Sequence, residues 1–278
     1  MPHISSIKPV KPKSLIEIVE AMPDLTPEEI EERKNSVQKP KPEEQTSPIS
    51  TPTGNMIFVT DENIFKEINK YLAKEHPKLE NKLTFADNIM KNSNTYLAVA
   101  VDEFCKKYLS NYRIAIQKDL ETNLNMFKGF YIDSGLALRS LTEPNSSQAN
   151  YLFEQLKERG IKLENLPIFL NLRGLKLDSN LNFNLTDESS YKLNANCLNW
   201  KNESFYSQTD NFGLPKEIDE NSLRKIWTIK YGLSGVCLER DSSLFARGGN
   251  LVASVGNGRV VFVSNSEGIA NALQNFSV

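Results

Sequence analysis

The first half of the chain carries apolar residues at the spacing of amphipathic helices. A short apolar strand is expected at residues 57–59. Asp61 follows it and is placed to cap a helix, which Pro77 ends. Further helical stretches are expected at residues 97–108, 116–127 and 146–160.

From residue 168 onward the apolar pattern changes from helical spacing to alternation, which is typical of strands. One helix is predicted within this strand-rich half. Asp219 is placed to cap it, and its apolar side carries Leu223, Ile226, Trp227 and Ile229. The strands expected from alternation lie at residues 168–172, 175–177, 181–185, 191–198 and 235–238.

Asn257-Gly258 predicts a β-hairpin near the C-terminal end. Asn-Gly readily adopts the positive φ values of a type I′ turn, which joins two antiparallel strands. The flanking apolar residues 251–255 and 259–263 are therefore expected to pair with each other. A closing helix is expected over residues 264–276.

These patterns predict an α/β (α+β) chain, with a helical N-terminal half followed by a strand-rich C-terminal half that ends in a β-hairpin and a helix. We expect a mainly helical region at residues 55–160 and a strand-rich region at residues 161–278. Residues 1–54 form a Pro- and Lys-rich arm that is expected to be mostly disordered, with short helices. The arm serves either as a plain linker or as a peptide ligand.

Composition and charge narrow the function classes. The net charge is -2, so no overall field draws the chain to DNA or to an anionic membrane. No basic cluster interleaves with aromatic residues along the sequence, so nucleic-acid binding is not expected. The longest aliphatic run, residues 97–101, is far shorter than the roughly 20 residues of a membrane span. Since the start also lacks a signal-peptide pattern, we expect a soluble protein that is cytoplasmic or is delivered to a cytosol without a cleavable signal.

Few residues are suited to nucleophilic or metal chemistry. His3 lies in the arm, and His76 lies at a predicted helix end. Neither has a cysteine or second histidine at ligand spacing, so no metal site and no cofactor are expected. Burial is the ordinary state of cysteines flanked by apolar residues, and it makes them inert. The chain has three cysteines, Cys105, Cys197 and Cys237. We therefore predict no catalytic residue.

One stretch near the C-terminus does suggest chemistry. Glu239-Arg240-Asp241 leads into Arg247-Gly248-Gly249-Asn250, followed by Gly-Asn-Gly-Arg and a second apolar strand. This stretch resembles the pentein superfamily of guanidine-modifying enzymes, especially the peptidylarginine and agmatine deiminases. The resemblance implies that Asp241 grips a substrate guanidinium and that Asn250 belongs to the same substrate-binding set. A carboxylate suits that role because it can bind a planar guanidinium through two hydrogen bonds.

Two functions from different classes remain open. The first is a non-enzymatic interaction protein that binds a protein partner, with the composition of a secreted bacterial effector. The second is an incomplete pentein-type hydrolase whose catalytic His and Cys lie outside this chain. Whether the protein is an enzyme stays open at this point, as does its oligomeric state.

Overall fold

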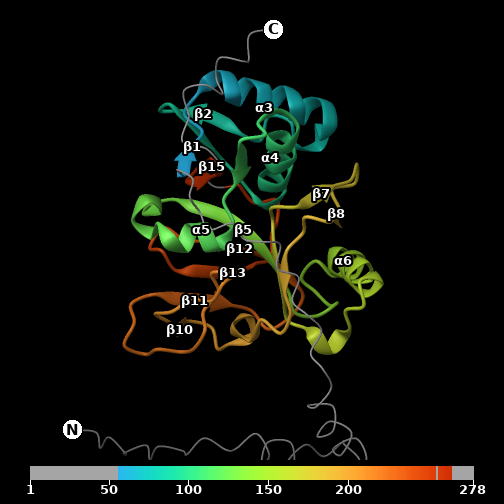
Figure 1. Cartoon of the computed structure of the whole chain (residues 1–278), viewed down its shortest axis with the longest axis vertical. Helices are drawn as coiled ribbons and strands as arrows, with labels where there is room; N and C mark the ends of the chain where they lie inside the picture. The colour runs from blue at the N-terminus through green and yellow to red at the C-terminus, as the bar shows by residue number, and fades with distance from the viewer. Residues whose placement is uncertain (1–55, 255, 265–278) are drawn as a thin grey trace, which may run out of the picture. The chain divides into compact units, whose positions relative to one another are not determined.

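A mixed sheet of eight strands organises the part of the chain that the computed structural model describes, residues 56–254 and 256–264. Seven strands lie in the order β10-β11-β13-β12-β5-β6-β9, and β14 pairs with β5 (Figure 1). Most neighbours are antiparallel, whereas β11–β13 and β14–β5 are parallel. The bounds are β5 Tyr131–Leu138, β6 Ile168–Asn171, β9 Tyr191–Lys192, β10 Ser204–Phe205, β11 Lys225–Thr228, β12 Leu233–Leu238, β13 Leu244–Gly248 and β14 Gly258–Arg259.

A second sheet has the order β1-β15-β4, and two small antiparallel pairs complete the described strands. The helix α4 packs against β4, β5 and β7, and α6 packs against β8 (Figure 1). The remaining strands are β1 Met56–Phe58, β2 Thr84–Ala86, β3 Ile89–Lys91, β4 Tyr112–Ile114, β7 Leu175–Leu177, β8 Phe183–Leu185 and β15 Val261–Ser264. The described α-helices are α3 Glu62–Glu75, α4 Thr95–Tyr108, α5 Gln117–Thr122 and α6 Ser146–Glu158.

The expected mixed α/β class is confirmed, and so are the main helices of the first half. Asp61 caps α3 as predicted, because its Oδ1 accepts the backbone N–H of Asn63 at 2.7 Å and of Ile64 at 3.3 Å. Asn94 caps α4 in the same way through Leu97. Burial of the apolar face of each helix then supplies most of the stabilisation.

β5 is the central strand, and alternation along the sequence does not reveal it. The structure covers this strand on both faces, so almost all of its residues are buried, including the polar ones near its start. These buried polar residues interrupt the apolar pattern of the strand. On one face Leu136 and Leu138 join the core beneath α4 and α6. On the other face Ala137 joins a second cluster with Phe169 and Tyr206.

The helix predicted after Asp219 is wrong. Asp219 closes a turn instead, with its Oδ1 accepting the backbone N–H of Asn221 at 3.1 Å. The following residues form β11, in which Ile226 is fully buried and Trp227 is half-buried on the other side of the sheet. An apolar residue on each side of one strand produced spacing that resembles a helix.

The predicted C-terminal hairpin is also wrong. Asn257 and Gly258 do not adopt positive φ, so they do not form a type I′ turn. Gly258–Arg259 pairs with β5 in parallel, and the next strand, β15, pairs with β1 and β4. The strands around Asn257-Gly258 therefore pair with β1, β4 and β5, which are distant in the sequence, and not with each other as the local Asn-Gly preference would favour.

One further prediction is confirmed only in part, and two others concern residues that the structure does not describe. The strand expected at residues 191–198 is limited to β9, after which the chain turns into a short 3₁₀ helix, Asn196–Asn199. The arm at residues 1–54 and the closing helix beyond Ser264 lie outside the described residues.

Gly135 in β5 tests how tightly the central strand is packed. A Cβ at this position would lie 2.2 Å from Cε2 of Phe169 and 2.8 Å from the carbonyl oxygen of Leu170. We expect Gly135→Ala to lower the free energy of unfolding by about 2 kcal/mol, because the backbone oxygen cannot move away freely. Gly256→Ala is the control, since nothing lies within 4 Å of its Cβ position. Equal urea midpoints for the two variants would contradict this packing.

Candidate functional site

The three cysteines are all buried and are not poised as nucleophiles. Burial raises the pKa of Cys105 and of Cys237, and it raises the pKa of Cys197 to about 12. The thiolate, which is the reactive form, is therefore strongly disfavoured at neutral pH. The ring of His76 lies against Tyr71, and its Nε2 lies 3.6 Å from a carboxylate oxygen of Glu103. Neither ring nitrogen has a hydrogen-bond partner among the described residues, so none of the three sulfurs is bonded to it.

Asp241 and Asn250, the two residues suggested by the pentein resemblance, flank β13 and are both exposed. Asp241 Oδ1 accepts the backbone N–H of Ser243 at 2.9 Å, and Asn250 Oδ1 accepts that of Val252 at 3.2 Å. Each side chain thus stabilises its own turn. The substrate-binding role that the resemblance implies for them stays a prediction.

A cleft of about 410 Å³ lies beside α4, and its lining carries as many lysines as carboxylates, some of which are paired with each other. The hydroxyl of Tyr71 donates to Glu103 at 3.4 Å, and burial together with that carboxylate raises the pKa of Tyr71. Lys106 binds both Asp102 and Glu188. Because the charges inside this cleft neutralise each other, it offers little to an ionic ligand.

Asp133 is a buried carboxyl group beside the first residue of α4. Its Oδ1 accepts a hydrogen bond from Thr95 Oγ1 at 3.0 Å, whereas its Oδ2 has no partner in the described part of the chain. Burial disfavours the ionised form and raises the pKa of Asp133 to about 7. Within the described residues, however, no group of three His, Cys, Asp or Glu side chains could hold a metal ion.

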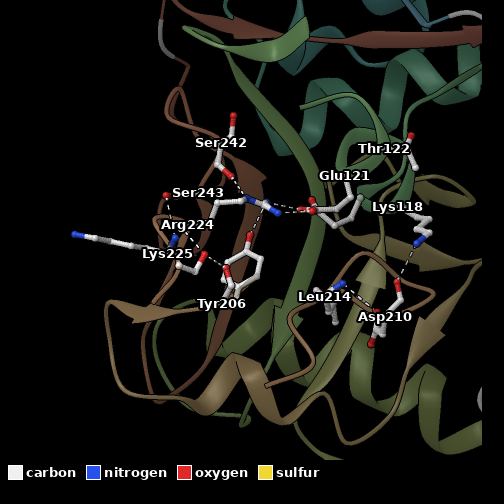
Figure 2. A network of polar contacts seen from close by, with 12 residues as sticks. Lys118, Glu121, Thr122, Tyr206, Asp210, Leu214, Arg224, Lys225, Ser242 and Ser243 are labelled. Carbon is white, nitrogen blue, oxygen red and sulfur yellow. Dashed lines mark hydrogen bonds and ion pairs between the residues drawn. The ribbon is translucent and has the colours of Figure 1, made fainter. Parts of the chain in front are cut away.

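An extensive polar network surrounds Arg224, at the end of the long loop between β10 and β11 (Figure 2). The guanidinium donates to both carboxylate oxygens of Glu121, at 2.7 and 2.8 Å. It also donates to the Tyr206 hydroxyl at 2.6 Å and to the Ser242 carbonyl at 2.9 Å. Four hydrogen bonds therefore fix this arginine, and we call Glu121, Tyr206 and Arg224 the arginine clamp.

Electrostatics reinforce the arginine clamp. Burial alone would lower the pKa of Arg224, but the hydrogen bond to Glu121 and the neighbouring charges outweigh it, so the pKa is raised. Burial, followed by the nearby Glu121 carboxylate, raises the pKa of Tyr206. Arginine therefore stays charged and the phenol stays neutral. The arrangement satisfies its own groups, which suits a structural role better than a catalytic one.

The arginine clamp and further hydrogen bonds fix the path of the loop. Asp210 folds the middle of the loop, since its Oδ1 accepts the N–H groups of Phe212 and Leu214 at 2.8 and 3.0 Å. Lys118 on α5 donates to the carbonyl of Asp210 at 3.3 Å (Figure 2). The side chains of Phe212 and Leu214 are buried, so this half of the loop belongs to the core.

The remaining part of the loop, which we call the 216–223 segment, faces solvent. Leu223 is 93% exposed and Ile218 is 52% exposed, although both are large aliphatic residues. Glu217 and Glu220 are exposed beside them, and Asp219 closes the turn. A hydrogen-bonded backbone thus presents two large apolar side chains to solvent, with acidic side chains around them.

Sequence reasoning missed this segment because it placed Leu223 on a helix. The signal was nevertheless present, since Leu-Pro-Lys-Glu-Ile-Asp-Glu-Asn-Ser-Leu at residues 214–223 places two isolated aliphatic residues among polar ones. The sequence does not tell which aliphatic residues of this stretch are buried, and the structure shows that these two remain in solvent.

Comparison of the whole chain with protein-family profiles, curated proteins and solved structures finds no match. Among the described helices, none combines the length and apolar character that crossing a bilayer requires.

Proposed function

We propose that the chain is a non-enzymatic interaction protein that binds a protein partner through the 216–223 segment. The observation that carries this proposal is the 93% exposure of Leu223 directly beside Arg224, whose guanidinium is held by four hydrogen bonds. Burying one leucine side chain contributes about 1.5–3 kcal/mol. A pre-ordered loop loses little conformational entropy when it binds, so most of that energy is available for affinity.

The chemistry of the segment indicates the kind of partner. Its apolar residues, Ile218 and Leu223, would fill a hydrophobic pocket, and its acidic residues would face a basic rim around that pocket. Such a partner is a folded protein with a pocket edged by lysine or arginine. Delivery of the chain into a cytosol as a bacterial effector would suit this role and is part of the proposal.

Site-specific photo-cross-linking tests the proposal. A photoreactive amino acid at position 223 is expected to give one discrete adduct in extract of the cells in which the protein acts, because this side chain would enter the partner. The same amino acid at Leu163, which is 57% exposed on another element, is the control and is expected to give no such adduct. Adding Ile218→Asp should abolish the adduct from position 223. Identical adduct patterns from positions 223 and 163 would contradict the proposal.

A further inference from the structure

A second surface lies on the large sheet, where three strands bring aromatic and cationic side chains together. We call Phe205 of β10, Lys225 and Trp227 of β11, and Phe245 and Arg247 of β13 the cation–aromatic face. The register places Phe205 opposite Lys225, and Trp227 opposite Phe245. Residues that alternate with these point the other way, because successive side chains of a strand leave opposite faces of the sheet.

Burial confirms which side each residue occupies. Ile226, Leu244 and Ala246 are fully buried in the cluster on the opposite face. Trp227 and Phe245 are only half-buried, and Arg247 is exposed. The cation–aromatic face is therefore open to solvent. Figure 2 shows the side chain of Lys225 extending away from the arginine clamp, to which the preceding residue, Arg224, belongs.

The cations and rings alternate across this face. Lys225 Nζ lies 5.2 Å from the ring centroid of Phe205 and 5.3 Å from that of Trp227. Arg247 Cζ lies 4.8 Å from the centroid of Trp227 and 5.2 Å from that of Phe245. Each distance is within the range of a cation–π contact, so the rings hold the two cations in place on the surface.

Neither Lys225 nor Arg247 forms an ion pair with any residue that the structure describes. The other cations near a carboxylate, such as Lys192 and Arg224, are neutralised by it. The cation–aromatic face thus keeps two uncompensated positive charges on a protein whose net charge is -2. An anionic ligand would supply the missing countercharge.

We propose that the cation–aromatic face binds single-stranded nucleic acid. Unpaired bases present planar surfaces that stack on aromatic side chains, and the phosphates between them would pair with Lys225 and Arg247. A neutral sugar would leave both cations unused, and an acidic peptide would use the cations but offers few planar groups for the rings. Stacking does not require a particular base, so we expect little sequence preference.

This inference departs from the expectation that nucleic acid plays no part. That expectation depended on the linear sequence, in which Phe205, Lys225 and Arg247 lie about 20 residues apart from one to the next. The sheet register brings them side by side. The inference also goes beyond the proposed function, because the 216–223 segment does not contribute to this face.

Fluorescence anisotropy tests the proposal with labelled oligothymidine and oligouridine of about 20 nucleotides, and with a DNA duplex of the same length. We expect both single strands to bind, the duplex to bind more weakly, and Trp227→Ala to reduce affinity about tenfold or more. Two phosphate contacts predict a slope of about -1.4 for log affinity against log salt concentration. Comparison of the two single strands shows whether DNA or RNA is preferred.

Matched variants exclude a general charge effect. Lys225→Glu with Arg247→Glu should abolish binding, whereas Lys82→Glu with Lys162→Glu, which changes two exposed lysines in loops outside this face, should leave it intact. Trp227→Leu keeps an apolar group, so a loss of affinity with an unchanged melting temperature shows the need for a ring. Equal binding of polyglutamate, or unchanged affinity in the Trp227 variants, would overturn the proposal. Loss of cross-linking at position 223 with intact oligonucleotide binding would affect the proposed function alone.

Discussion

Replacing Asp133 by Asn is expected to change the way in which stability depends on pH. In the folded protein, burial raises the pKa of this carboxyl from its ordinary value of 3.8 to about 7. One pKa unit corresponds to about 1.36 kcal/mol, so the difference amounts to about 4 kcal/mol. The Asp133→Asn variant lacks this titration, and its unfolding free energy relative to the wild type should rise by that amount between pH 4 and pH 8.

The sign of the effect follows from proton uptake. Between pH 3.8 and about 7 the folded state holds a proton on Asp133, whereas the unfolded state has lost it. The unfolding free energy that this group contributes is therefore complete at acidic pH and decreases as the pH rises through that window. This group therefore makes the fold more stable at mildly acidic pH than at neutral pH, which is opposite to the behaviour of a carboxylate in a salt bridge.

Urea unfolding at a series of pH values measures this effect in the wild type, in Asp133→Asn and in a control. Asp187→Asn is the control, because that side chain is exposed in a turn and should shift the curve without changing its slope against pH. Parallel stability curves for the wild type and Asp133→Asn would show that the pKa of Asp133 is the same in the folded and unfolded states, and would contradict the effect of its burial.

Helices were predictable from the sequence where local signals and tertiary packing agree. In α3 and α4 the caps Asp61 and Asn94 bond the first turn, and the apolar spacing coincides with the buried face. Asn257-Gly258 is the opposite case, because its local turn preference competes with pairing to β1, β4 and β5. Those long-range pairings depend on strand register, which a single sequence does not specify.

The cation–aromatic face was not predictable because its middle strand carries apolar residues on both sides. Trp227 and Ile226 are neighbours in the sequence, yet one faces solvent and the other belongs to the core. A reader of the sequence sees two apolar residues and assigns both to the interior. The alternation of Lys225 and Trp227 with Ile226 and Thr228 could have indicated a strand, but the partners on β10 and β13 become apparent only from the pairing.

Breaking the arginine clamp is the other change with a large expected effect. The Glu121 side chain is 4% exposed and that of Arg224 is 19% exposed, so solvent screens this pair weakly. Arg224→Met would leave the buried Glu121 carboxylate with only the Gln117 amide, 2.9 Å from Oε1, among the partners described for it. We expect a loss of about 3 kcal/mol in unfolding free energy, because an uncompensated buried charge is strongly destabilising. Lys157→Met, at an exposed ion pair on α6, is the control and should change stability little.

A double-mutant cycle separates the charge pair from the packing around it. Glu121→Met should be destabilising on its own, whereas Glu121→Met with Arg224→Met should be less destabilising than the sum of the single variants, since it removes both buried charges. Hydrogen exchange of the amides between Tyr206 and Arg224 should be faster in Arg224→Met than in the wild type. Strict additivity of the two substitutions, with unchanged exchange in the loop, would contradict the arginine clamp. Since the clamp is what holds the 216–223 segment ready for a partner, the same Arg224→Met variant is expected to weaken the cross-link formed from position 223.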